Sequence, residues 1–180
     1  MKKLILAAVM FIATSASIQA QLLHLGVKAG VNFANYSGTD IQTDGITSYH
    51  AGLVAEIKLL DKFSIQPELL YTTQGATYKD AFTEIKNELG YIAIPVMAKI
   101  YLNNSFSLEV GPQASFLVSE KNKFNLKDSQ TFDFALNAGL GLKITKSIFV
   151  QGRYSLGLTE VSKDAEAKNS VFSLSAGFMF

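Results

Sequence analysis

The sequence predicts an all-β protein, an eight-stranded antiparallel up-and-down transmembrane β-barrel that occupies residues 21–180. From Gln21 onward the chain alternates apolar residues with polar or small ones, which is the period of a β-strand with one apolar face. The gaps between these segments alternate between short and long along the chain, as in a barrel with tight turns at one rim and long loops at the other. A secretory leader precedes the barrel.

The leader covers residues 1–20. Lys2 and Lys3 form its positive region, residues 4–13 form an apolar core too short to span a bilayer, and Ala20 is the small residue before the expected cut. If it were not cleaved, the same segment would be an N-terminal membrane anchor. Export and a barrel together predict an integral protein of the outer membrane in a Gram-negative envelope.

We expect the strands in order at residues 22–34, 48–58, 62–74, 88–101, 105–119, 131–145, 147–158 and 170–180. The sixth shows the pattern best, because Phe132, Phe134 and Leu136 alternate with Asp133, Ala135 and Asn137. Short turns are expected at residues 59–61, 102–104 and 145–146, on the periplasmic side, and long loops at residues 35–47, 75–87, 120–130 and 159–169. Residues 80–88, with weak helical periodicity, are expected as loop.

Three of these strands contain a proline, at Pro67, Pro95 and Pro112. Proline cannot donate a hydrogen bond to the ladder, so we expect a bulge or a local break in pairing at each position.

Two barrels fit the alternation, a soluble lipocalin-like barrel with the apolar face inside and a membrane barrel with that face outside. Glycines decide between them, because eight of them share the non-apolar face: Gly26, Gly30, Gly52, Gly111, Gly139, Gly141, Gly157 and Gly177. Glycine weakens a strand that faces water, whereas a narrow eight-stranded lumen needs small residues. Aromatic residues near the strand ends fit the two lipid interfaces: Phe63, Phe106 and Phe180 at one rim, and Phe33, Tyr71, Phe116, Phe132 and Phe172 at the other.

The inward face also carries charges of both signs, which we expect to form a lumenal polar network: Lys28, Glu56, Glu68, Lys99, Glu109, Asp133, Lys143 and Arg153. His24, His50 and Lys58 lie on the same phase. Unpaired charges are costly in a narrow interior, so these side chains should pair with one another. The network is then either the polar core of a closed barrel or the lining of a gated ion path, and eight strands favour the closed barrel.

Signals for chemistry or cofactors are weak. Ser48 precedes His50 by two residues on one strand face and Glu56 follows, but no nucleophile motif surrounds them. His24 and His50 are too few for a metal site, and Gly139 and Gly141 precede no helix that could bind phosphate. With 16 Lys and Arg against 15 Asp and Glu, and no cysteine, nothing favours nucleic acid, disulfides or thiol chemistry. We expect no enzyme, no cofactor and no metal.

Four segments in order resemble the PorT-like outer-membrane β-barrel family. They are YIAIPVMAK at residues 91–99, similar to that family's Tyr-Leu-Glu-Ile-Pro-Leu-Leu-x-Lys strand; VGPQAS at 110–115; RYSLGL at 153–158; and GVKAGVN at 26–32. The resemblance spans the mature chain and implies a barrel similar in shape to OmpA and OmpX. Its founding member is implicated in protein secretion across the outer membrane. Ala93 departs from the family, whose members usually have an inward glutamate at this position. In the family, that glutamate could pair with the residues corresponding to Lys99 or Arg153.

We therefore expect a non-enzymatic integral barrel with a structural or loop-mediated interaction role. The alternatives are an accessory component of secretion and a narrow channel. The expected partners are outer-membrane lipid and the barrel-insertion machinery, which by resemblance to other outer-membrane proteins would read the terminal aromatics Phe178 and Phe180. Secretion components are a further candidate, and nucleic acid is not.

Overall fold

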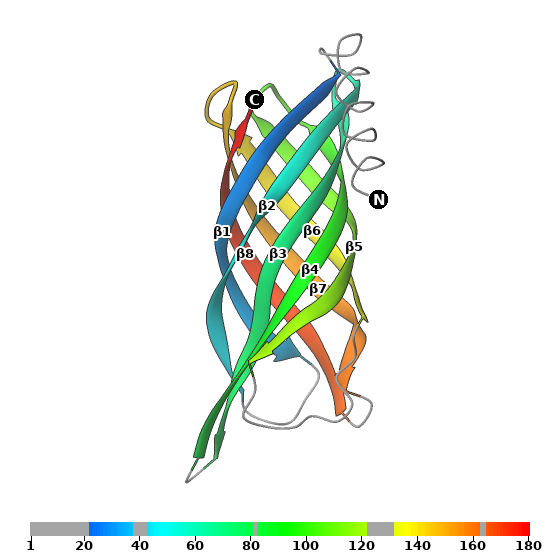
Figure 1. Ribbon diagram of the computed structural model, residues 1–180. Coiled ribbons are helices and arrows are strands. Elements are labelled where there is room, and N and C mark those ends of the chain that lie inside the picture. The colour runs from blue at the N-terminus through cyan, green and yellow to red at the C-terminus, as the bar shows by residue number, and fades with distance from the viewer. Residues whose placement is uncertain (1–21, 38–42, 81–82, 122–131, 163–164) are drawn as a thin grey trace, which may run out of the picture.

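The computed structural model describes residues 22–37, 43–80, 83–121, 132–162 and 165–180. It contains eight strands: β1 (Leu23–Ser37), β2 (Thr43–Leu60), β3 (Phe63–Asp80), β4 (Thr83–Tyr101), β5 (Phe106–Lys121), β6 (Phe132–Lys143), β7 (Ile148–Ser162) and β8 (Ala165–Met179). Each strand pairs antiparallel with the next, and β8 pairs with β1 to close the barrel (Figure 1). The predicted fold class is confirmed. Within the described ranges no helix is long and apolar enough to cross a bilayer. The predicted leader lies outside these ranges.

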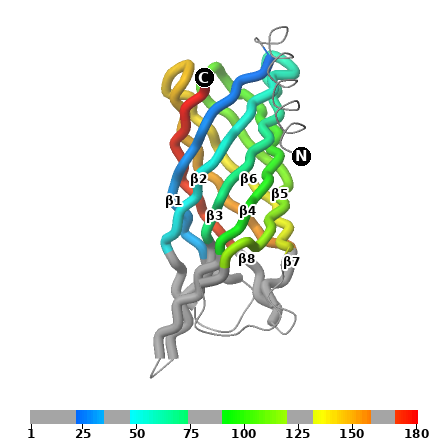
Figure 2. The backbone as a smooth tube through the Cα atoms, viewed as in Figure 1, coloured from blue at the N-terminus to red at the C-terminus, as the bar shows by residue number. Residues whose placement is uncertain are grey.

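The two ends of the barrel differ. One end, called here the turn end, has tight connections at residues 61–62, 102–105 and 144–147, and the C-terminus lies beside them (Figure 2). The opposite end, called the hairpin end, joins β1 to β2, β3 to β4, β5 to β6 and β7 to β8, and the β3–β4 hairpin projects there (Figure 1). Tight connections are present at the turn end as predicted, whereas two of the four predicted long loops, 75–87 and 159–169, are strand hairpins whose pairing reaches Asp80↔Thr83 and Ser162↔Ala165.

The long loops were predicted too long. The β3–β4 pairing continues without a shift from Gln74↔Leu89 to Asp80↔Thr83, so the expected loop at residues 75–87 is a hairpin. Residues 83–88, expected as loop, belong to β4. Likewise β1 continues to Ser37, β2 begins at Thr43, and β7 and β8 extend to Ser162 and from Ala165. Outside the apolar band a strand needs only backbone pairing, so the alternation that marked the strands ends before they do.

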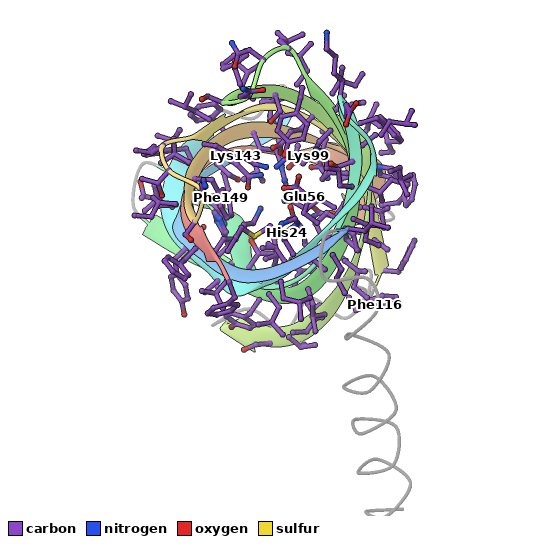
Figure 3. All side chains as sticks on the ribbon, turned by 90° about the horizontal axis from the view of Figure 1, so that it is seen from above. His24, Glu56, Lys99, Phe116, Lys143 and Phe149 are labelled. Atoms are coloured by element: carbon purple, nitrogen blue, oxygen red, sulfur yellow. The ribbon has the colours of Figure 1, made fainter. Side chains whose placement is uncertain are left out.

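The two faces of the wall are sorted as the alternation predicts. Large apolar side chains point outward and are exposed, for example Leu136 at 48% and Leu174 at 47%, whereas Asn137, the residue after Leu136, is fully buried. Figure 3, a view from the turn end, shows Lys99, Lys143 and Glu56 inside the ring and Phe116 outside it. Aromatic pairs lie on the outer wall, including Phe33 with Phe172 at 6.3 Å and Phe116 with Phe132 at 5.5 Å between ring centroids.

The prolines interrupt pairing without a bulge. Each keeps its partner on the following strand, namely Pro67↔Val96, Pro95↔Gln113 and Pro112↔Leu136. The ladder with the preceding strand skips two residue pairs at each proline, and the register is the same on both sides of the gap. The missing N–H therefore opens the ladder locally, and the strand continues. The local breaks were predicted, and bulges at these positions were not needed.

Candidate functional site

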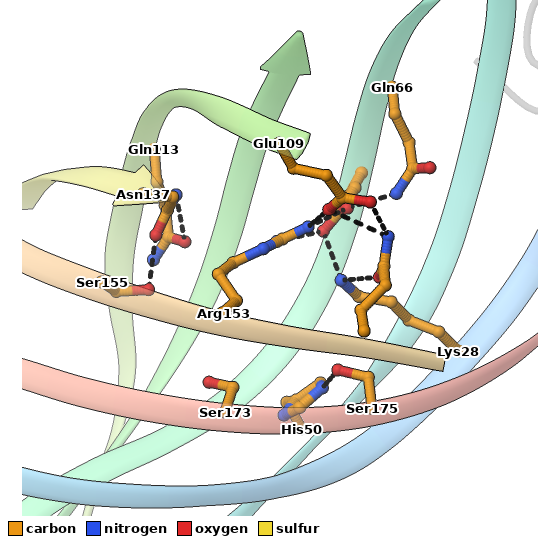
Figure 4. Close-up of polar contacts among 12 residues, drawn as sticks. Lys28, His50, Gln66, Glu109, Gln113, Asn137, Arg153, Ser155, Ser173 and Ser175 are labelled. Carbon is orange, nitrogen blue, oxygen red and sulfur yellow. Dashed lines mark hydrogen bonds and ion pairs between the residues drawn. The ribbon is translucent and has the colours of Figure 1, made fainter. Parts of the chain in front are cut away.

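The lumen is the candidate site, because the predicted charged residues meet there. Glu68 of β3 lies at its centre and binds two cations. Arg153 of β7 donates from Nη1 to Oε2 at 2.9 Å and from Nη2 to Oε1 at 2.8 Å, a bidentate pair. Lys28 of β1 approaches Glu68 Oε2 at 2.8 Å (Figure 4). All three side chains are at most 5% exposed. Three strands that are distant in sequence are thus tied together across the lumen.

Glu109 of β5 extends the same cluster. It accepts from Arg153 Nη2 at 3.3 Å and lies 3.3 Å from Lys99 Nζ of β4. Gln151 donates to both oxygens of Glu109 at 2.8 and 3.1 Å and accepts from Lys28 at 3.2 Å. On the other side, Gln66 donates to Glu68 at 2.7 Å and accepts from Lys99 at 2.9 Å. The two glutamines form hydrogen bonds with the carboxylate oxygens and ammonium groups of the cluster and so help to satisfy these buried polar atoms.

Glycines make room for these groups. A Cβ at Gly141 would lie 2.5 Å from Glu109 Oε1, and one at Gly139 would lie 3.3 Å from Arg153 Cβ. A side chain at Gly141 would push against the cluster, and one at Gly139 would first meet the backbone carbonyl of Gly152 on β7, at 2.6 Å. The small residues that sequence reasoning assigned to a narrow lumen are therefore needed where the large charged side chains lie.

Glu56 of β2 ends the cluster at the turn end. Tyr101 donates to its Oε1 at 2.5 Å, Lys99 lies 3.5 Å from Oε2, and Lys143 lies 3.4 Å from Oε1. Lys143 also stacks 4.5 Å from the centre of the Tyr101 ring, and its side chain is 35% exposed. A cavity of about 60 Å³, called here the mouth pocket, opens beside these groups and is lined by Glu56, Lys99, Lys143, Thr145, Lys146 and Ser147 among others.

Seven of the eight predicted network residues thus form one connected group, called here the charged layer: Lys28, Glu56, Glu68, Lys99, Glu109, Lys143 and Arg153. Asp133, the eighth, is buried on β6 opposite Ser115, nearer the hairpin end, and takes no part in these ion pairs. His24 and Lys58, on the same phase, are exposed at the turn end. Ala93 is buried, and Lys99 and Arg153 pair instead with carboxylates of β2, β3 and β5.

Amides and hydroxyls fill the lumen on the hairpin side of the charged layer, and we call them the neutral layer. His50 binds Ser175 Oγ through Nε2 at 2.8 Å (Figure 4). Its Nδ1 lies 2.7 Å from Asn32 Oδ1. Asn32 also donates to Thr72 Oγ1 at 2.9 Å. Further around the wall, Asn137 donates to Gln113 at 3.2 Å and accepts from Ser155. A cavity of about 30 Å³ beside His50 has room for one or two waters.

Ser175, His50 and Asn32 are hydrogen-bonded in the order of a hydrolase triad, but a substrate could not reach them. The cavity beside them, about 30 Å³, cannot admit an acyl group, and all three residues are buried. Ser48, weighed above as a nucleophile, instead donates to the Thr73 carbonyl at 2.6 Å. No group of three or more metal-ligating side chains occurs in the described part of the chain. The geometry supports hydrogen bonding that holds the wall together.

Sequence reasoning missed the neutral partners of the charged layer. Gln66, Tyr101 and Gln151 each form hydrogen bonds within it, and each is at most 8% exposed. Their signal was available, because each lies on the inward phase two residues from a predicted charged residue: Glu68, Lys99 and Arg153. Uncharged polar residues on the inward face should therefore be counted with the charges.

Strands can span a membrane only as a closed barrel, and such a barrel has an apolar outer face and a polar interior. The family model described as outer membrane protein beta-barrel domain matches residues 19–163. The chain belongs to this family. As a member of the outer-membrane β-barrel family, it is an integral protein of the outer membrane.

Solved structures of other small outer-membrane barrels share the fold. The chain is similar to Ail, the attachment invasion locus protein of Yersinia pestis, with a TM-score of 0.55 at 15% identity over 87% of this chain and 98% of that one. It is also similar to Neisserial surface protein A, with a TM-score of 0.56 at 13% identity over 88% and 97%. A search of curated proteins finds no match. At these identities the likeness shows the fold alone.

Proposed function

We propose that this protein is a non-enzymatic outer-membrane scaffold whose closed barrel presents the hairpin end to a partner outside the cell. The observation that carries the proposal is the contrast between a filled lumen and a projecting β3–β4 hairpin. The charged layer crosses the barrel with Glu68, Glu109 and Lys99 at most 4% exposed. Eight strands leave an interior that side chains just fill, whereas aqueous pores use 16 or more. A solute path through this lumen is therefore disfavoured.

The hairpin supplies the surface. Its pairing reaches Asp80↔Thr83, whereas the described pairing of β4 with β5 ends at Glu88↔Lys121, so residues 83–87 of β4 form an edge without a described neighbour. The other strand of the hairpin, β3, is paired with β2 as far as Thr43↔Tyr78. The projecting β-ribbon, visible in Figure 1, offers backbone groups to an extended peptide or protein edge. The proposal includes the orientation usual for such barrels, with the turn end in the periplasm. The finer PorT-like assignment rests on the four sequence segments and is part of this proposal, and no contact of the described residues favours the secretion role.

Site-specific photo-crosslinking in native outer membranes tests this proposal. A photoreactive residue at Thr83 should give a defined adduct that is lost when residues 77–86 are replaced by a two-residue turn, and the same probe at Asn104 of the turn end should give none. Adducts from Asn104 alone would contradict the proposed orientation and surface. A lack of any adduct from Thr83 in cells that hold the folded protein would contradict the interaction role.

The C-terminal strand supports a second partner, the barrel-insertion machinery. Phe178 and Phe180 lie outside the wall, 45% and 77% exposed, with ring centroids 5.7 Å apart. The Phe180 N–H donates to the Leu25 carbonyl at 2.8 Å, so the same end also closes the barrel. Deleting residues 178–180 should leave the protein exported but not inserted. Comparison with Phe180→Ala separates the two roles, because insertion of that variant at normal levels would show that the terminal aromatic is not read.

A further inference from the structure

The mouth pocket at the turn end carries more positive charge than its own carboxylate can balance. The charged layer contains four cations and three carboxylates, all joined by the ion pairs described above. Glu68 and Glu109 are engaged by Arg153, Lys28 and Lys99 deep in the lumen. The group as a whole therefore has one unbalanced positive charge. At the mouth, the lysines Lys99, Lys143 and Lys146 line the pocket together with the single carboxylate Glu56.

The contacts at Glu56 do not use all the N–H donors of the lysines beside it. Lys99 and Lys143 approach it at 3.5 and 3.4 Å, longer than the usual 2.7–2.9 Å of a charge-assisted hydrogen bond. Tyr101 already donates to Glu56 Oε1 at 2.5 Å, the same oxygen that Lys143 faces. Each ammonium has three donors, and Lys143 uses one of them on this crowded oxygen. The remaining donors of Lys143 belong to a side chain that lines the mouth pocket and is 35% exposed.

The β6–β7 turn adds a third cation and two hydroxyls to the same pocket, at Lys146, Thr145 and Ser147. The Thr145 oxygen accepts from the backbone N–H groups of Ser147 at 3.2 Å and Ile148 at 2.9 Å. Its own O–H is therefore left to donate. The turn thus holds one hydroxyl in a fixed place beside the ammonium groups.

We propose that the mouth pocket binds a phosphate group. Three lysines and one fixed hydroxyl suit a compact tetrahedral anion, whereas no arginine fork, which would favour a planar carboxylate, lines this pocket in the described residues. The cavity of about 60 Å³ has room for an anion that replaces a few waters. Binding would supply the negative charge that the charged layer lacks. The phosphate comes either from a soluble phosphate compound or from a phospholipid headgroup at the rim. This site is independent of the hairpin surface proposed above.

Amide-detected NMR of the full mature barrel in phosphate-free maltoside micelles tests the site. Inorganic phosphate, added at constant ionic strength against sodium chloride, should produce saturable shifts at residues 144–148. Lys143→Gln should weaken the apparent Kd about tenfold, because it removes a charged donor. Lys62→Gln, on the neighbouring turn and not among the pocket-lining residues, is the matched control and should leave the Kd unchanged. Heat-modifiable migration on gels shows that each variant is folded.

A second arm identifies the source of the phosphate. The barrel is placed in nanodiscs of a neutral galactolipid, with or without phosphatidylglycerol and without free phosphate. Shifts at residues 144–148 that need phosphatidylglycerol and are lost in Lys143→Gln assign the site to a headgroup, and shifts that need free phosphate assign it to a soluble ligand. The proposal is overturned if neither probe gives saturable shifts, if chloride gives the same shifts, or if Lys62→Gln weakens binding as much as Lys143→Gln.

Discussion

The charged layer and the neutral layer fill the same lumen by different means. In the charged layer, bidentate and bridging ion pairs such as Arg153 with Glu68 join strands across the barrel. In the neutral layer, single hydrogen bonds such as His50 with Ser175 join strands nearer to one another in the wall. Losing one partner of a buried ion pair leaves an uncompensated charge, whereas losing one neutral partner leaves only an unmade hydrogen bond. The two layers should therefore respond very differently to single substitutions.

Glu68→Gln should have the largest effect on stability. It keeps the side chain's volume but leaves Arg153 and Lys28 buried without their shared carboxylate, at a cost of about 3–5 kcal/mol. Urea unfolding in lipid vesicles measures this cost. Lys143→Gln is the control, because it removes a partly exposed cation from a layer with excess positive charge and should change stability by less than about 1 kcal/mol. Equal losses for the two variants would show that charge balance does not govern this layer.

Asn137→Ala in the neutral layer should have an intermediate effect. Asn137 is fully buried, donates to Gln113 and accepts from Ser155. Its removal leaves Ser155 without this acceptor, at a cost of about 1–3 kcal/mol. Gln113 Oε1 also loses its donor, while Gln113 Nε2 keeps its separate contact with Ser115 at 3.0 Å. The same unfolding assay applies, and a loss larger than that of Glu68→Gln would reverse the ranking of the two layers.

Ser175→Ala should have the smallest effect. His50 Nε2 loses its partner, but the adjoining cavity of about 30 Å³ has room for a water that can take the place of the hydroxyl. The expected loss is about 0.5–1 kcal/mol. Thr72→Val, which removes an acceptor of Asn32 in the same layer, gives a second measurement. A loss of several kcal/mol for Ser175→Ala would mean that no water enters and that substitutions in this layer cost as much stability as those in the charged layer.

The sequence predicts the barrel, its two faces and the set of inward charges, because alternation with period two reports which face each residue is on. It does not predict the pairs, because the turn expected at residues 102–104 covers residues 102–105 in the structure, and the β4–β5 register there places Lys99 opposite Glu109. It does not predict that Glu68 meets Arg153, which is 85 positions away. That contact depends on how the strands are staggered when the barrel closes, and no short segment encodes the stagger. The continuation of β3 and β4 past the apolar band was missed for a related reason, because only backbone pairing marks it.

Planar-bilayer recording of the purified barrel tests most directly whether the charged layer closes the lumen. With Glu68, Glu109 and Arg153 buried and joined across the barrel, the protein should give no regular single-channel steps at any applied voltage. Glu109→Gln, which loosens the layer, should at most raise irregular leakage. Regular, ion-selective steps from the wild-type protein that Glu109→Gln or Arg153→Gln abolishes would contradict a closed lumen and show that these residues line a conducting path.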